Sequence, residues 1–182
     1  MTATATAQKV EALYWGSVDS PRGTCVIMAT EAGVCWMGTP GTTADSGFAW
    51  LERRGKLAYE QVVEGEEIAP LRQAMDELRR YFAGERVQFT SPLDLRGTAF
   101  QVAVWQEMQR IPYGETRTYS ELARLVGRPQ APRAVGAASG ANPVAIIVPC
   151  HRVVGSDGSL TGYGGGLPTK EWLLALEQSS LL

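Results

Sequence analysis

Residues 118–140 read TYSELARLVGRPQAPRAVGAASG, and this stretch predicts two short helices joined by a turn. Thr118 and Glu121 have the spacing of a capping box, which begins a helix, and Gly127 ends that helix. A turn at residues 128–130 leads to a second helix over residues 131–139. The pair is typical of a helix-turn-helix. Many helical cores contain the same pattern, so the pattern alone does not indicate a function.

The second helix of this pair carries mostly small side chains around Arg133. They are Ala131, Ala134, Gly136, Ala137, Ala138, Ser139 and Gly140. Small side chains suit tight packing in a core, and they suit close approach to another surface equally well. Composition leaves both interpretations open.

Outward from this pair, the carboxy-terminal half is mostly helical and the amino-terminal half is mixed. A helix is expected over residues 98–110, where apolar residues recur at helical spacing. In the first half, β-branched and aromatic residues predict strands over residues 10–18, 23–30 and 34–38, with one more over 86–90. Residues 70–82 predict a helix that has proline at its first position. These patterns predict an α/β domain at residues 1–93 and a helical domain at residues 94–182.

Size and composition indicate an ordinary globular protein. The chain has 182 residues, of which 45% are hydrophobic and 20% are charged. No apolar run is long enough to cross a bilayer, and residues 1–8 lack the pattern of a secretory signal. We therefore expect a cytoplasmic protein.

Three cysteines and one histidine restrict the covalent and metal chemistry. An odd number of cysteines does not build a disulfide framework, and one histidine does not make a multi-histidine metal site. Cys25 and Cys35 are expected to be small hydrophobic residues of the core.

The net charge of −2 is unevenly distributed. Residues 1–93 hold nine Lys/Arg and twelve Asp/Glu, whereas residues 94–182 hold eight and seven. Between Arg110 and Arg133 there are five arginines and two acids. Binding of phosphates requires a local basic face, although arginines on a solvated helix face explain the same pattern.

The most reactive residues follow an apolar run at residues 144–148, which we expect to be strand-like. This run leads into Pro149, Cys150, His151 and Arg152. A cysteine acts as a nucleophile in its thiolate form and therefore needs a base or a positive field nearby. The chain's one histidine is adjacent to Cys150. Neighbouring side chains on a strand point apart, so contact between the two requires a turn or a bridging water.

The sequence around Cys150 resembles the active-site signature of the O6-alkylguanine-DNA alkyltransferases, and the likeness extends over residues 97–177. The matching stretches are NPV at 142–144, PCHRVV at 149–154, IPYGE at 111–115, TY at 118–119, RAVG at 133–136, YGGG at 163–166 and KEWLL at 170–174. The resemblance implies a ribonuclease-H-like α/β domain followed by a mostly helical winged helix-turn-helix domain. It also implies repair of O6-alkylguanine and O4-alkylthymine in DNA. The alkyl group would pass irreversibly to Cys150 after base flipping, once per molecule.

The resemblance implies roles for particular residues. Cys150 accepts the alkyl group, His151 is the base acting through a water, and Glu177 orients the histidine. Asn142 ties the helix pair to the active-site turn. Tyr119 crowds the phosphate of the target nucleotide and donates a proton to the leaving guanine, while Arg133 fills the vacated base stack. The small residues expected at the DNA are Ala134, Gly136 and Ser139, and those expected around the flipped base are Val153, Tyr163, Gly164 and Gly165.

The resemblance implies double-stranded DNA with alkylated bases as the partner, bound through the minor groove. It implies a monomer with no cofactor, no membrane and no obligate protein partner. Some relatives hold zinc in the first domain. Here that domain has Cys25, Cys35 and no histidine, so we expect no metal.

Three other interpretations remain open. They are a sensor that binds alkylated bases without reacting, a Cys-His hydrolase that turns over repeatedly, and a winged-helix structural module with a coincidental Cys-His pair. Whether Cys150 gains mass separates the first of these from an alkyltransferase.

Overall fold

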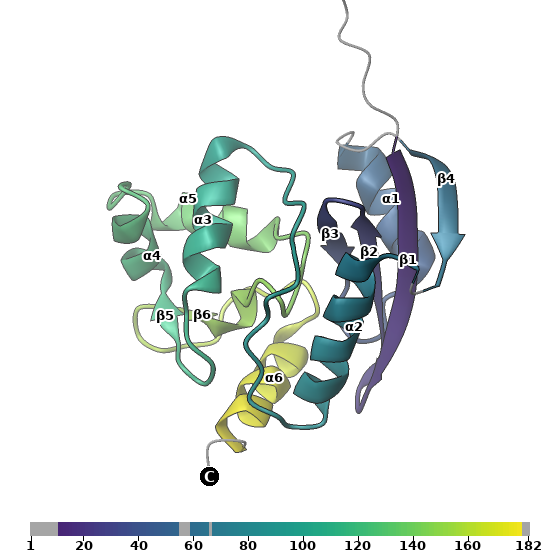
Figure 1. The fold of residues 1–182 in the computed structure, drawn as a ribbon. Coiled ribbons are helices and arrows are strands. Elements are labelled where there is room, and N and C mark those ends of the chain that lie inside the picture. The colour runs from purple at the N-terminus through teal and green to yellow at the C-terminus, as the bar shows by residue number, and fades with distance from the viewer. Residues whose placement is uncertain (1–10, 55–58, 66, 180–182) are drawn as a thin grey trace, which may run out of the picture.

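The computed structural model describes residues 11–54, 59–65 and 67–179, so the expectation for residues 1–8 lies outside the described residues. Figure 1 shows a sheet flanked by helices next to a group of short helices, with the last helix returning to the first half. The predicted fold class, an α/β half followed by a mostly helical half, is confirmed.

The first half contains a four-stranded sheet in the order β3-β2-β1-β4. The strands are β1 (Glu11–Ser20), β2 (Gly23–Thr30), β3 (Gly33–Met37) and β4 (Tyr59–Glu64). The first three are antiparallel neighbours and coincide closely with three of the predicted strands, while β4 runs parallel to β1.

Each face of the sheet is covered by one helix. Val26 and Met28 of β2 pack on the side of α1 (Ala44–Arg54), whereas Cys25 and Ile27 pack on the side of α2 (Ala69–Phe82). This alternation is the period of two that a strand buried on both faces requires. Cys25 and Cys35 are buried in the core and outside any disulfide, as predicted.

The strand predicted over residues 86–90 is wrong, because the segment is extended without joining the sheet. Glu77 of α2 holds the end of this segment. Its carboxylate is 8% exposed and accepts hydrogen bonds from the backbone N–H groups of Thr90 and Ser91, at 2.9 and 3.2 Å. A buried carboxylate needs such donors, and these N–H groups are therefore not available to a neighbouring strand.

The sequence does not predict helix α1 or strand β4. Gly47 interrupts the helical pattern of α1, yet the structure requires it there: a Cβ atom would lie 2.5 Å from Met28 and 2.8 Å from the ring of Trp36. β4 is an edge strand with Val62 exposed, so it lacks the continuous apolar run of a central strand.

The second half begins with α3 (Ala99–Gln109), α4 (Tyr119–Leu125) and α5 (Pro132–Gly140), close to the three predicted helices. Thr118 and Glu121 form the predicted capping box at the start of α4. The indole N–H of Trp105 in α3 donates to the carbonyl of Ala138 in α5 at 2.8 Å. The helix pair is thereby fixed to the helix behind it.

The predicted strand at residues 144–148 is also wrong, because the segment turns back on itself. The N–H of Val148 donates to the carbonyl of Val144 at 3.0 Å, and Ile146 has a φ of 70°. This φ is unfavourable for a β-branched residue. The side chain of Asn142 stabilises the turn: it accepts from the N–H of Val144 at 3.0 Å and donates to the carbonyl of Val148 at 2.8 Å.

The last element that the structure describes is α6 (Leu167–Ser179), which lies beside α2 (Figure 1). The rings of Phe82 in α2 and Trp172 in α6 stack with their centroids 6.1 Å apart. A short 3-10 helix, η1 (Cys150–Arg152), and strand β6 (Val153–Val154) precede α6, and β6 pairs with β5 (Arg117–Thr118). The last helix therefore brings the residues after Cys150 back against the first half.

Candidate active site

Cys150 is the first residue of η1, directly after the turn held by Asn142. It is 9% exposed and lines a hollow of about 250 Å³, which we call the nucleophile hollow. Trp36, Thr39 and Trp50 of the first half also line this hollow, as do Tyr163 and Gly164 of the second. The thiol therefore faces a confined space to which both halves contribute.

The thiol of Cys150 is neutral at rest. Burial raises its pKa above the ordinary value, although the side chain of Asn142 and the charge of Lys170 act in the opposite direction. A thiol with a raised pKa reacts only after a base takes its proton. The site must therefore supply a base at the time of reaction.

The adjacent His151 is fully buried and has the state of such a base. Burial lowers its pKa, so the ring is neutral at pH 7. Its Nε2 lies 2.7 Å from Oε1 of Glu177. The hydrogen bonds from His151 and Arg152 hold the pKa of Glu177 at about 2, against the effect of burial, so this carboxylate can only accept.

The tautomer of His151 follows from that contact. Because Glu177 only accepts, Nε2 carries the proton and Nδ1 has a free lone pair. Nδ1 is buried and has no hydrogen-bond partner in the part of the chain that the structure describes. A buried acceptor without a partner, on the residue that follows a neutral thiol in the chain, is chemically suited to receive the thiol proton.

Glu177 is held by donors from several segments. Tyr81 of α2 donates its hydroxyl to Oε1 at 2.8 Å, and the N–H of Gly114 donates to Oε2 at 3.0 Å. Nε of Arg152 donates to both carboxylate oxygens at 3.2 and 3.0 Å, and its Nη2 to Oε1 at 3.0 Å. Tyr81 belongs to the first half of the chain, so both halves fix this carboxylate.

Residues predicted at a partner surface gather around a second hollow of about 620 Å³, which we call the helix-face hollow. Tyr119, Arg133 and Gly136 line it. Arg133 is exposed, and a Cβ atom on Gly136 would lie 3.8 Å from the ring of Tyr119. The hydroxyl of Tyr119 donates to the carbonyl of Thr161 at 3.3 Å.

The two hollows adjoin, because they share four lining residues. These are Gly140, Gly162, Tyr163 and Gly164. A group that entered from the face of α5 could therefore approach Cys150 past Tyr163 and Gly164, two of the residues predicted for a base pocket.

The remaining predicted residues lie elsewhere around the site. Ala134 is exposed on α5, whereas Ser139 is buried and lines the nucleophile hollow. Val153 is fully buried in the core, and Gly165 packs against Thr39. Neither Val153 nor Gly165 lines either hollow.

Sequence reasoning gave no role to three residues of this site: Tyr81, Arg152 and Lys170. Lys170 is fully buried and donates to the carbonyls of Val153 and Thr161 at 2.6 and 2.8 Å. The signal for Lys170 and Arg152 was present, because both stand in the matched stretches KEWLL and PCHRVV. Tyr81 gave no local signal, since its partner lies 96 residues away.

Metal ligation finds no support among residues 11–54, 59–65 and 67–179. No group of three or more His, Cys, Asp or Glu side chains lies close enough there to hold an ion.

Two family models match the two halves of the chain. Residues 13–95 match the model of the ribonuclease-like domain of 6-O-methylguanine DNA methyltransferase. Residues 99–179 match the model of the DNA binding domain of 6-O-methylguanine DNA methyltransferase. A methylated-DNA–protein-cysteine methyltransferase of Methanosarcina acetivorans is 43% identical over 168 residues, which are 92% of this chain and 99% of the relative.

A second curated relative and a solved structure agree with these matches. The relative of the same name from Mycolicibacterium paratuberculosis is 60% identical over 105 residues, and the match spans 58% of this chain and 64% of the relative. A crystal structure of the Mycobacterium tuberculosis protein in complex with DNA is similar at a TM-score of 0.74 and 42% identity, and covers 92% of this chain and 94% of that one.

The neutral state of His151 predicts how stability depends on pH. The pKa of His151 in the folded state lies below the unfolded value of about 6.5. The unfolded chain therefore binds a proton that the folded chain does not bind. The free energy of unfolding should therefore fall as pH decreases from about 7.5 to about 5.5, with a slope approaching ~1.4 kcal/mol per pH unit. Urea unfolding across this range measures the slope.

His151 is the one histidine of the chain, so His151→Gln should abolish this slope. A histidine NMR titration in the folded state provides a readout that does not depend on the variant's stability. Protonation of the folded ring at its ordinary pKa, or a flat stability profile of the parent, would contradict the neutral buried state.

The hydroxyl of Tyr81 predicts a second stability effect. Tyr81→Phe should lower the free energy of unfolding by about 1.5–3 kcal/mol, because it removes a buried hydrogen bond to a charged acceptor. Tyr113→Phe is the matched control: its hydroxyl is buried without a partner among the described residues, so its loss removes no hydrogen bond and should not lower the free energy of unfolding. Equal losses in the two variants, measured by urea unfolding, would contradict the role of Tyr81.

Proposed function

The chain belongs to the methylated-DNA–protein-cysteine methyltransferase family, and from this membership we propose that it repairs alkylated DNA by transferring the alkyl group to Cys150. The substrates are O6-alkylguanine and O4-alkylthymine in double-stranded DNA. The observation that carries the proposal is the buried, unpartnered Nδ1 of His151, the residue directly after the buried thiol of Cys150, with the opposite ring nitrogen held by Glu177.

The reaction is an in-line displacement at the alkyl carbon. The thiol proton of Cys150 passes through a water to Nδ1 of His151, and the thiolate sulfur forms a bond to the alkyl carbon. The bond from that carbon to O6 breaks, and its electron pair stays on the guanine. Tyr119 donates a proton to the leaving guanine, because a neutral base leaves more easily than an anion.

The surroundings of Cys150 support this step. The positive charge of Lys170 favours the thiolate once it forms, and Glu177 stabilises the imidazolium that receives the proton. Asn142 holds the turn that presents Cys150. The product is a thioether, which water does not cleave, so each molecule acts once.

The DNA is bound through its minor groove by α5. Arg133 stands exposed at the helix-face hollow beside Gly136, and Ala134 is exposed next to it on α5, so these small residues permit close approach. Ser139 is buried and lines the nucleophile hollow, where it leaves room for the flipped base. The target nucleotide is flipped out, because its O6 cannot be reached inside the duplex. Arg133 enters the vacated stack, and the flipped base passes Tyr163 and Gly164 on its way to Cys150, with Val153 and Gly165 supporting the pocket.

The proposal extends to the setting of the protein. Domains at residues 1–93 and 94–182 work together in a cytoplasmic monomer that needs no obligate protein partner. The described residues contain no helix of the length and apolarity needed to cross a membrane.

The decisive experiment is intact-mass analysis after mixing with a duplex that contains O6-methylguanine. One methyl group should be added per molecule, on the peptide that holds Cys150, and the base should be restored in equal amount. Cys150→Ala should gain no mass and still bind the duplex. Many repaired bases per molecule would indicate a hydrolase, and DNA binding without any mass gain would indicate a sensor.

Base flipping predicts a difference between two substrates for Arg133→Ala. The variant should repair the duplex at least about tenfold more slowly, because extrusion costs a few kcal/mol that Arg133 helps to offset. Its reaction with free O6-methylguanine base should remain near the parent rate. Arg86→Ala, an exposed arginine that lines neither hollow, is the control for charge. Equal slowing on both substrates would exclude a role of Arg133 in extrusion.

A further inference from the structure

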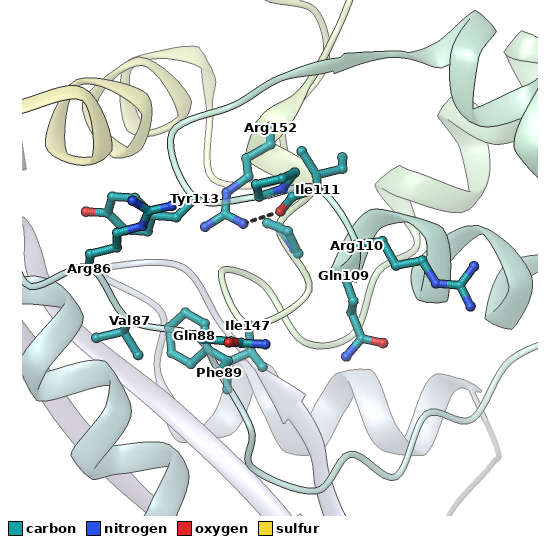
Figure 2. Close-up of a pocket in the computed structure, with 12 residues that line it drawn as sticks. Arg86, Val87, Gln88, Phe89, Gln109, Arg110, Ile111, Tyr113, Ile147 and Arg152 are labelled. Carbon is teal, nitrogen blue, oxygen red and sulfur yellow. Dashed lines mark hydrogen bonds between the residues drawn. The ribbon is translucent and has the colours of Figure 1, made fainter. Parts of the chain in front are cut away.

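An open cleft of about 650 Å³ lies between the two halves and is separate from both hollows. We call it the interdomain cleft (Figure 2). Ile147 and Pro149 line this cleft, whereas Ala145 and Cys150 line the nucleophile hollow. The segment that carries the nucleophile therefore separates two different spaces. The function proposed above uses none of the space in the cleft.

The lining of the cleft is basic, although the protein as a whole carries a net charge of −2. Three arginines line it and no Asp or Glu does: Arg86, Arg110 and Arg152. Arg110 forms an ion pair with Glu107, and in Figure 2 its guanidinium points away from the centre. Arg86 is exposed and has no ion-pair partner among the described residues. Arg152 is itself ion-paired with Glu177 at 3.0 Å, so the uncompensated positive charge of the cleft comes from Arg86, and Arg152 contributes N–H donors.

Arg152 has hydrogen-bonding capacity left over. Its guanidinium uses Nε and one N–H of Nη2 on Glu177, and one N–H of Nη1 on the carbonyl of Ile111 at 2.7 Å. Of about five N–H groups on an arginine, one on each terminal nitrogen is left without a partner among the described residues. Two N–H groups at the end of a guanidinium match the two oxygens of a carboxylate or phosphate. Figure 2 shows this end directed into the cleft.

The rest of the lining suits an apolar body next to that charge. Val87, Phe89 and Ile147 lie together on the side of the cleft opposite Arg152 (Figure 2), and the amide side chains of Gln88 and Gln109 border the same space. The volume falls within the range of about 300–1,000 Å³ that is usual for small-molecule sites.

We propose that the interdomain cleft binds a small organic anion, with an aromatic or aliphatic body and one carboxylate or phosphate group. The anionic group binds the terminal N–H groups of Arg152 with support from Arg86, and the body packs on Phe89 and Ile147. Charge selects the ligand, because the lining contains no carboxylate and Arg86 has no ion-pair partner among the described residues.

The test uses 2-naphthoate as the probe and the full chain as the receptor. Isothermal titration calorimetry should show that 2-naphthoate binds at least about tenfold more tightly than neutral 2-naphthamide, the matched compound without the charge. In nitrogen-15 NMR spectra, 2-naphthoate should shift the side-chain amide signals of Gln88 and Gln109. Signals of Tyr119 and Gly136 at the helix-face hollow should stay unchanged.

Two variants test the charge without touching buried residues, since Arg86 and Gln88 are both exposed. Arg86→Gln removes a cation and Gln88→Glu adds an anion, so each should weaken 2-naphthoate binding about tenfold or more. Arg53→Gln makes the same charge change on α1, outside the cleft, and should leave binding unchanged. Equal affinity for the naphthamide, parent affinity in both cleft variants, or shifts confined to the helix-face hollow would overturn the proposal.

Discussion

Glu177 carries a negative charge where solvent does not reach it, and the fold has to supply donors for that charge from distant segments. A buried carboxylate is tolerated only when it is paired and fully hydrogen-bonded. Here the donors come from α2, from the loop after α3 and from η1. These segments must meet at one point, which explains why α6 returns to the first half and packs against α2.

The same carboxylate determines the state of the reactive residues. Because Glu177 stays ionised, it fixes the proton of His151 on Nε2 and leaves Nδ1 as an acceptor. Burial keeps both His151 and Cys150 neutral at rest. The site therefore holds a neutral acid and a neutral base on consecutive residues, with no charge on either at rest. This arrangement avoids the cost of a permanent thiolate in an apolar setting.

Local signals in the sequence predict local structure well. They fail where a residue that is distant in the sequence determines the conformation of a segment. The capping box of Thr118 and Glu121 and the strand over residues 23–30 follow from neighbouring residues alone. The segments at 86–90 and 144–148 have strand-like composition, but the carboxylate of Glu77 binds the N–H of Thr90 at the end of the first, and the amide of Asn142 bonds to both ends of the second. The motif indicated Cys150 and His151, whereas Tyr81 could not be found, because only the three-dimensional fold brings it to Glu177.

The contribution of the first half to the site follows from its backbone as well as from Tyr81. The N–H of Met37 in β3 donates to the carbonyl of Pro143 at 2.8 Å, and the N–H of Ala145 donates to the carbonyl of Met37 at 3.2 Å. The edge of the sheet thus holds the start of the turn in which Ile146 adopts its unfavourable φ. A strained turn persists only when several surrounding contacts hold its backbone in that conformation. The sheet and the side chain of Asn142 together provide that constraint, so the first half is part of the machinery that presents Cys150.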